Sequence, residues 1–221
     1  MPIETIIFDM DGVLVDSEVY WAQARYEFAE ERGLQWNDTF QREAMGQSTI
    51  GWARVMQSRL NLDEHTDDII VEMKSRVLAK YEVKTPLRPG AYEAVEFATA
   101  NYRCGLASGS PTNIIETVIR TTGMDKLFET VVFGDTVPNG KPAPDIYLEA
   151  LNRLDAAPAT SIGIEDSAHG IHALKAAGMI AIAAPSPDFP LPQAVLILAD
   201  AHITSMENFT PDLLKQLEAM Q

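Results

Sequence analysis

The chain of 221 residues has 17 basic and 32 acidic residues, a net charge of −15 and 46% hydrophobic residues. This acidity disfavours nucleic acids and anionic membranes as partners, and the apolar runs are far shorter than the ~20 residues that span a bilayer. Because the N-terminus also lacks the basic and apolar regions of a signal peptide, we expect a cytoplasmic globular protein with no inferable protein partner.

The first predicted element is a strand over residues 3–8, directly followed by Asp9 and Asp11. Side chains two residues apart on an extended chain point the same way, so both carboxylates are expected to face one crevice. Gly12 allows the backbone to turn sharply behind them. Taken alone, this Asp-x-Asp-Gly segment is equally typical of an acidic turn that caps a helix.

Residues 17–83 contain no strand-like run, and their apolar residues recur with helical spacing. We therefore predict an all-helical domain inserted into an α/β domain made of residues 1–16 and 84–221. An insertion directly after the aspartates would lie over the strand ends, where open parallel sheets bind ligands. We interpret it as a mobile cap that excludes water, and a rigid extra subdomain is the alternative.

Helix ends are marked by glycine, proline and hydroxyl residues. Gly33 and Gly46 are expected to end helices in the insertion, and Ser48 is expected to cap the helix that follows it. Further along, Ser110 and Pro111 are placed to open a helix as its N-cap and first residue.

Short apolar runs alternate with helical segments through the rest of the chain. This alternation predicts an α/β fold, a Rossmann-like doubly wound parallel sheet with helices on both faces. The predicted strands cover residues 103–107, 131–133, 161–164 and 179–183.

Polar residues follow three of these strands. Ser108 and the backbone amides from Gly109 onward could hold an anion, Lys141 lies in a loop stiffened by two prolines, and Glu165 and Asp166 end the fourth strand. Each segment has an ordinary explanation when taken alone: a capped helix start, a solvated lysine or an acidic helix cap.

The parallel topology brings all these strand ends to one edge of the sheet. Four carboxylates there, Asp9, Asp11, Glu165 and Asp166, cannot all ionise unaided, because like charges raise each other's pKa. A hard divalent cation with oxygen ligands is the expected neutraliser, which indicates Mg²⁺. The serine and the lysine would then contact the oxygens of an anionic substrate.

Other metal and thiol chemistry is not indicated. The four histidines are scattered without metal-ligand spacing, so a zinc site is not expected. Cys104 lies within an apolar run and is predicted to be a buried, inert thiol.

In the order DMDGV, ASGSPT, GKPAPD and IEDS, the four segments resemble the motifs of the haloacid dehalogenase superfamily, in the branch of small phosphatases and β-phosphoglucomutases with a helical cap. The resemblance covers nearly the whole chain and implies phosphoryl transfer. By this resemblance, Asp9 is the nucleophile that forms an aspartyl-phosphate and Asp11 is the general acid and base. Ser108, Gly109 and Lys141 would bind the phosphate of a small phosphorylated substrate.

The resemblance also implies a magnesium site. Asp166 and the carboxylate of Asp9 would be ligands, together with the backbone carbonyl of Asp11, and Glu165 would lie at or near the metal. These roles fit the physical requirement, since positioning and charge neutralisation supply most of the acceleration in phosphoryl transfer.

The branch of the family is a closer question. Asp11 disfavours dehalogenation, because the dehalogenases generally lack this second acid. The β-phosphoglucomutases that the chain resembles carry a histidine and an arginine where Trp21 and Thr49 stand here. Without that arginine, a bisphosphate intermediate is difficult to hold, although Arg42 or Arg54 could substitute. We therefore expect hydrolysis, with the mutase reaction as the alternative.

The chain also resembles the family's 2-deoxyglucose-6-phosphate phosphatases, which share Ser-Glu-x-x-Trp after the aspartates, and this resemblance implies a sugar phosphate as the substrate. Trp21 either faces the substrate or packs inside the cap, while Trp36 and Trp52 are assigned to packing. A third hypothesis is a non-enzymatic binding module, which the complete set of motif residues disfavours.

Overall fold

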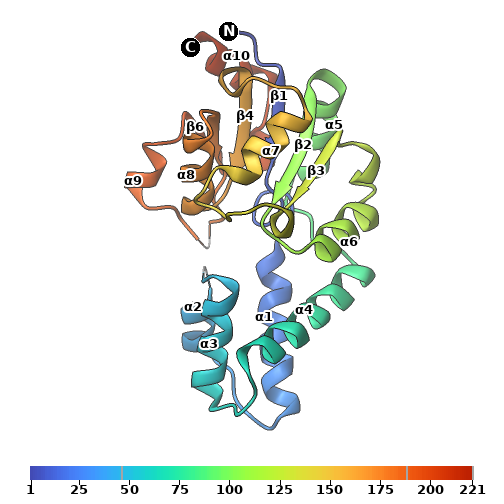
Figure 1. Cartoon of the computed structure of the whole chain (residues 1–221), viewed down its shortest axis with the longest axis vertical. Coiled ribbons are helices and arrows are strands. Elements are labelled where there is room, and N and C mark those ends of the chain that lie inside the picture. The colour runs from blue at the N-terminus through green and yellow to red at the C-terminus, as the bar shows by residue number, and fades with distance from the viewer. Residues whose placement is uncertain (46, 188, 221) are drawn as a thin grey trace. The chain divides into compact units, whose positions relative to one another are not determined.

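The structure, a computed structural model, describes residues 1–45, 47–187 and 189–220. It divides into two compact units, one made of Met1–Asp16 with Thr85–Gln221 and the other of Ser17–Lys84 (Figure 1). The second unit is inserted between the first strand of the sheet and the remaining strands. Among the described helices, none combines the length and the hydropathy needed to cross a membrane.

The inserted unit contains only helices over the residues that the structure describes. Ser48 caps its third helix as predicted, because its hydroxyl accepts a hydrogen bond from the Gly51 N–H at 3.2 Å. Gly33 lies in the turn after the first helix with a φ of +68°, whereas Gly46 lies outside the described residues. The helices are α1 Ser17–Glu31, α2 Asp38–Ala44, α3 Thr49–Leu60 and α4 Thr66–Val83.

All three tryptophans of the chain belong to the inserted unit. Trp36 and Trp52 are buried, as predicted. Trp21 is half-buried, and its ring centroid lies 5.4 Å from that of Trp52. The contact shows that Trp21 packs inside the unit with at least one face, and a second role toward the substrate stays a prediction.

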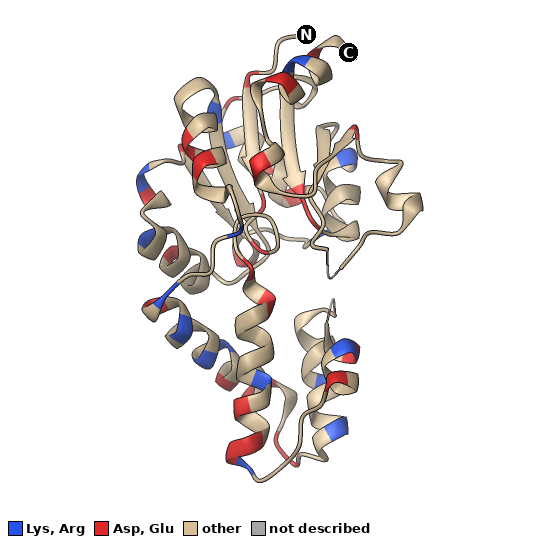
Figure 2. Cartoon of the chain, turned by 180° about the vertical axis from the view of Figure 1, so that it is seen from behind, with Lys and Arg blue, Asp and Glu red and all other residues tan. Residues whose placement is uncertain are grey.

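Ion pairs join α1 to α4 in the inserted unit, whose helices carry residues of both signs (Figure 2). Glu72 accepts from Arg32 at 2.6 Å and from Arg76 at 2.7 Å, and Arg76 also donates to Glu31 at 2.9 Å. The Arg32 guanidinium lies 3.6 Å from the ring centroid of Phe28. Partial burial raises the pKa of Glu72, but the hydrogen bonds from both arginines outweigh this effect and lower it.

The first unit is built on a six-stranded parallel sheet with the order β3-β2-β1-β4-β5-β6. This topology and the surrounding helices confirm the predicted fold class. Every predicted strand is present, but β6 was not predicted, because a strand of two residues leaves no recognisable apolar run. The strands are β1 Thr5–Phe8, β2 Arg103–Ser108, β3 Thr130–Phe133, β4 Ser161–Glu165, β5 Ile180–Ala183 and β6 Ala201–His202.

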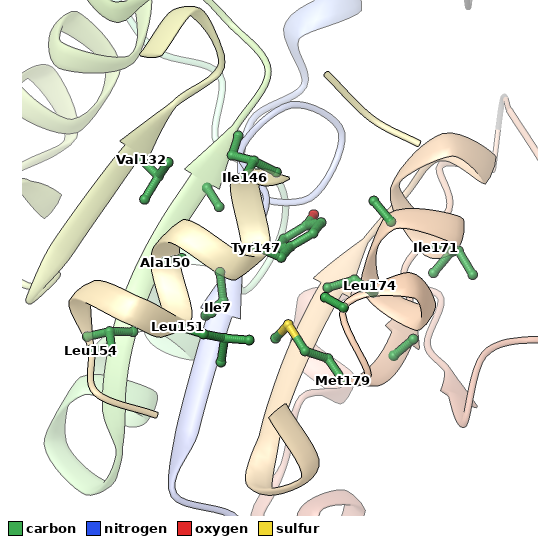
Figure 3. Packing of buried hydrophobic residues seen from close by; sticks show 14 of the residues in the cluster. Ile7, Val132, Ile146, Tyr147, Ala150, Leu151, Leu154, Ile171, Leu174 and Met179 are labelled. Carbon is green, nitrogen blue, oxygen red and sulfur yellow. The ribbon is translucent and has the colours of Figure 1, made fainter. Parts of the chain in front are cut away.

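Both faces of this sheet are covered, as neighbouring residues of β1 show. Ile7 belongs to a buried cluster with Tyr147 and Leu174, which lie on two helices packed on the same side (Figure 3). Phe8 points the other way, and its ring packs edge-on against Phe209 with centroids 5.9 Å apart. The α-helices of this unit are α5 Ala91–Asn101, α6 Thr112–Thr122, α7 Asp145–Arg153, α8 Ala168–Ala176, α9 Gln193–Leu196 and α10 Pro211–Ala219. Short 3-10 turns are η1 Met124–Lys126, η2 Gly134–Thr136, η3 Pro158–Thr160 and η4 Met206–Asn208.

The predicted start of α6 is wrong. The helix begins at Thr112, with Pro111 in the N-cap position and no side-chain cap from that residue. Asp135 supplies the cap instead, since its carboxylate accepts from the Thr112 N–H at 3.2 Å and from the Thr112 hydroxyl at 2.7 Å. The Ser110 hydroxyl is directed to Asp11.

Candidate functional site

The candidate site lies at the carboxyl ends of the parallel strands β1, β2 and β4. Asp9 follows β1, Ser108 is the last residue of β2, and Glu165 ends β4 with Asp166 next in the chain. Because β1 pairs with both β2 and β4, these three strand ends are adjacent. This is the position where the strand order of a doubly wound sheet reverses and where such sheets bind ligands.

Lys141 reaches this edge from the loop before α7. Its ammonium group donates to Asp9 Oδ1 at 2.6 Å and to Glu165 Oε1. Burial lowers the pKa of Lys141, but the two carboxylates outweigh burial and raise it well above its ordinary value. The lysine is therefore a fixed cation inside the site and is not the solvated loop residue that its sequence position also allowed.

The carboxylates of the site carry more negative charge than Lys141 alone compensates. Burial raises the pKa of Asp9 well above its ordinary value, with Lys141 opposing and the neighbouring acids adding to the effect. Burial and the nearby Glu165 likewise raise the pKa of Asp166 to about 8. Burial and the mutual repulsion of neighbouring carboxylates both favour the neutral acid.

A divalent metal ion fits the same residues. One carboxylate oxygen from each of Asp9, Glu165 and Asp166 lies within 4.8 Å of the other two. A donor set made only of oxygens is the one preferred by hard cations such as Mg²⁺. The Asp11 carboxylate is not part of this group in the described structure, which leaves its backbone carbonyl as the predicted ligand atom.

Glu165 is fully buried and both of its oxygens are occupied. Oε1 accepts from Lys141 and, at 2.6 Å, from the hydroxyl of Tyr147. Oε2 accepts from the Asp166 N–H at 3.1 Å and from the Ser167 hydroxyl at 3.1 Å. Although burial raises the pKa of Glu165, Lys141 and these hydrogen bonds outweigh it and lower the pKa.

Asp11 is held by two serine hydroxyls. Its Oδ2 accepts from Ser110 at 2.7 Å and from Ser108 at 3.3 Å. The Ser108 oxygen in turn accepts from the Ser110 N–H at 3.1 Å. The segment after β2 therefore orients the second aspartate, and the predicted phosphate-binding residue Ser108 lies directly beside it.

Two glycines, Gly12 and Gly170, permit close approaches at this edge. A Cβ on Gly12, whose φ is +74°, would lie 1.9 Å from Asp166 Oδ2, so the turn after β1 requires glycine for both conformation and space. A Cβ on Gly170 would lie 1.8 Å from the carboxyl carbon of Glu165. Gly109 differs, because a Cβ there would meet no atom within 4 Å.

The structure thus brings Asp9, Asp11, Ser108, Lys141, Glu165 and Asp166 to one edge of the sheet, with Gly109 next to Ser108 in the chain. Three neighbours of these residues were not predicted from the sequence. Tyr147 lies among apolar positions of α7 and reads as an ordinary core aromatic. Ser110 was interpreted as a helix cap. Gly170 gave no signal at all, because the space it leaves depends on the fold.

Cys104 is buried, and burial together with Glu129 raises the pKa of its thiol to about 12. It is therefore a neutral thiol near neutral pH, as its place in an apolar run predicted.

The chain is similar to known proteins over most of its length. A profile of haloacid dehalogenase-like hydrolases matches residues 3–178. The chain is 33% identical to the phosphorylated carbohydrates phosphatase of Thermotoga maritima over 80% of its own length and 82% of that protein. It is 31% identical to hexitol phosphatase B of Escherichia coli, over 92% and 93% of the two chains. The crystal structure of a putative β-phosphoglucomutase from Thermotoga maritima superposes with a TM-score of 0.84 at 29% identity, covering 97% of this chain and 99% of that one.

Proposed function

Because the chain belongs to the haloacid dehalogenase-like hydrolase family, we propose that it is a Mg²⁺-dependent phosphatase that hydrolyses a small sugar phosphate through an aspartyl-phosphate on Asp9. The observation that carries this proposal is the position of the Lys141 ammonium between Asp9 Oδ1 and Glu165 Oε1, with Asp166 close by at the same strand ends. A buried carboxylate next to a fixed cation is suited to attack an anionic phosphoryl group, because the cation offsets the repulsion between the two anions.

Asp9 and Asp166 would hold Mg²⁺, with Glu165 at or near the ion, and the ion would supply the remaining positive charge for the phosphoryl oxygens. Lys141 remains necessary beside the metal, because it contacts the attacking group directly. The Ser108 hydroxyl and the Gly109 amide lie at the end of β2 and would donate to oxygens of the same phosphate.

Asp11 would act first as the general acid and then as the general base. In the first half of the reaction it gives a proton to the leaving alkoxide, and in the second it accepts one from the water that hydrolyses the aspartyl-phosphate. The Ser110 hydroxyl fixes the carboxylate through Oδ2 at 2.7 Å, so Asp11 keeps a hydrogen bond when the single proton of the Ser108 hydroxyl turns from Asp11 to the phosphate. This role requires a group that is separate from the metal ligands, and the described metal-ligand group of Asp9, Glu165 and Asp166 does not include the Asp11 carboxylate.

The substrate class rests on the relatives. Two phosphatases that share at least 30% identity with the chain over most of both lengths are named for phosphorylated carbohydrates and for hexitols. We therefore propose a phosphorylated sugar or polyol for this chain as well, and a place among the enzymes of the cytoplasm that act on such metabolites.

The alternative is phosphoryl transfer between positions of one sugar, and similarity to a structure titled as a putative β-phosphoglucomutase favours it. Two positions of the inserted unit argue for water as the acceptor. Thr49 is the exposed first residue of α3, and Trp21 packs against Trp52. Neither side chain supplies the cation that would hold a second phosphate group.

One assay separates the two reactions. The purified protein is incubated with Mg²⁺ and a panel of hexose, hexitol and pentose phosphates, and with β-glucose 1-phosphate plus the corresponding bisphosphate. Free phosphate and glucose 6-phosphate are measured in parallel. We expect phosphate release that a chelator abolishes and excess Mg²⁺ restores. Glucose 6-phosphate formed with little free phosphate would assign the mutase reaction instead.

A further inference from the structure

Tyr147 has no part in the chemistry described above, yet it is anchored in the site. It lies on α7, is fully buried, and its hydroxyl donates to Glu165 Oε1 at 2.6 Å. The ring itself packs in the apolar cluster between α7 and α8 (Figure 3), and its centroid lies 5.1 Å from Lys141 Nζ. One side chain therefore contacts both partners of the Lys141–Glu165 ion pair.

The hydroxyl acts on an oxygen that is already shared. Glu165 Oε1 accepts from both Tyr147 and Lys141, while Oε2 is held by Ser167 and backbone N–H groups. Gly170 provides the space for this carboxylate. These contacts hold the Glu165 carboxylate in one orientation. The Tyr147 hydroxyl fixes Oε1, which is the oxygen that faces Lys141.

The direction of the Lys141 ammonium depends on the orientation of the Glu165 carboxylate. An ammonium group has three N–H donors, and Asp9 and Glu165 take two of them. With two donors fixed, the tetrahedral ammonium leaves one direction for the third, and under the proposed function this donor would meet an oxygen of the phosphoryl group beside Asp9. A carboxylate free to rotate would release that constraint.

We propose that Tyr147 is a positioning residue, which sets the direction of the Lys141 ammonium toward Asp9 and the phosphoryl group by fixing Glu165 Oε1. The expected effect on turnover rests on the proposed function. The expected effect on the orientation of Lys141 does not. Tyr102, which precedes the amino end of β2, is a half-buried tyrosine of the same unit that lies outside the site, and its ring packs on Phe97.

The test compares Tyr147→Phe with the matched control Tyr102→Phe, since both remove one hydroxyl and keep the ring. The first readout is the side-chain ammonium NMR signal of Lys141 in the metal-free protein, assigned by its loss in Lys141→Arg. The second is the steady-state kinetics of phosphate release with saturating Mg²⁺, and the third is the thermal unfolding midpoint.

In Tyr147→Phe we expect the Lys141 signal to shift or broaden, kcat to fall about tenfold, and KM to stay within twofold. Tyr102→Phe should match the wild type in all three readouts. An unchanged Lys141 signal with kcat within twofold of wild type would overturn the proposal. So would a Tyr147→Phe protein that is unfolded, because the hydroxyl would then serve stability.

The two proposals fail in different ways. If the wild-type protein released phosphate from no substrate, the proposed function would be wrong, and the NMR signal would still decide whether Tyr147 orients the lysine. If phosphate release were normal and the signal did not respond to Tyr147→Phe, only the positioning role would be wrong.

Discussion

Gly170→Ala should damage this protein, although the same change stabilises most helices. Gly170 is the third residue of α8, and its N–H donates to the hydroxyl of the helix cap Ser167 at 3.0 Å. An added Cβ would lie 1.8 Å from the carboxyl carbon of Glu165 and 2.0 Å from each of its oxygens. Since carbon atoms pack at about 3.5 Å or more, the carboxylate or the helix must move by at least roughly 1.7 Å.

The magnitude follows from the two ways to relieve this overlap. Moving the helix is an overpacking cost at the upper end of the usual range, about 3 kcal/mol. Moving Glu165 away from Lys141 breaks a buried ion pair, at a cost of about 3–5 kcal/mol. Alanine returns about 1 kcal/mol through its helix propensity. The expected net loss in the free energy of unfolding is therefore about 2–4 kcal/mol.

The chain offers a closely matched control. Gly51 is likewise the third residue of its helix and donates its N–H to a capping serine, Ser48. The nearest atoms to a Cβ there would be side-chain atoms of Gln47 and Ser48, at 3.0–3.2 Å. Gly51→Ala should be neutral or stabilising by up to about 1 kcal/mol.

Urea unfolding followed by far-UV circular dichroism measures the free energy of unfolding of both variants. Phosphate release measures kcat, which we expect to fall more than about 100-fold in Gly170→Ala. The reasoning is refuted if Gly170→Ala is as stable and as active as Gly51→Ala, because the Glu165 carboxylate would then not pack against α8 at Gly170.

Two further predictions concern other contacts. Ser110→Ala removes the 2.7 Å hydrogen bond to Asp11 and should lower kcat about tenfold, as expected for one hydrogen bond to a charged group. Steady-state kinetics of phosphate release checks this prediction, and an unchanged kcat would show that Asp11 does not depend on this hydrogen bond. Glu72→Gln should reduce the stability of the inserted unit by about 0.5–1 kcal/mol at pH 7, because Arg32 and Arg76 lose a partly exposed partner. Since the pKa of Glu72 is lowered from 4.5 in the folded protein, this difference should be complete above pH 4.5 and vanish as the pH falls through the lowered pKa. Tryptophan fluorescence reports it, as all tryptophans lie in that unit; a difference that persists in acid would contradict the assignment.

The strands, and the polar residues at their ends, could be predicted because both leave a pattern in the local sequence. Apolar runs mark strands that are buried on both faces, and the polar residues that follow β1, β2 and β4 fall at one edge once the strands are parallel. β6 escaped because a two-residue strand is held by its neighbour β5 and has no pattern of its own.

The details of the site depend on contacts between distant residues, which no local pattern encodes. The Ser110 hydroxyl could cap a helix or bind a carboxylate, and only the position of Asp11, nearly a hundred residues away, decides between them. Tyr147 looks like a core residue because its ring is one, and its role is visible only from the position of its hydroxyl. The sequence places Lys141 after a strand and so predicts it at the same sheet edge as the aspartates, but its contact with Glu165 is visible only in the fold.

The central claim is that Asp9 is the phosphorylated nucleophile, and trapping the phosphorylated enzyme tests it most directly. The protein is mixed with Mg²⁺ and a radiolabelled substrate from the panel, quenched in acid within milliseconds, and digested for peptide mass analysis. The account predicts an acid-stable, hydroxylamine-sensitive phosphate on Asp9. The label should be absent in Asp9→Asn and should accumulate in any Asp11→Asn protein that still forms it, because hydrolysis of the intermediate needs the Asp11 base. Full activity in Asp9→Asn, or a label on another residue, would contradict the account.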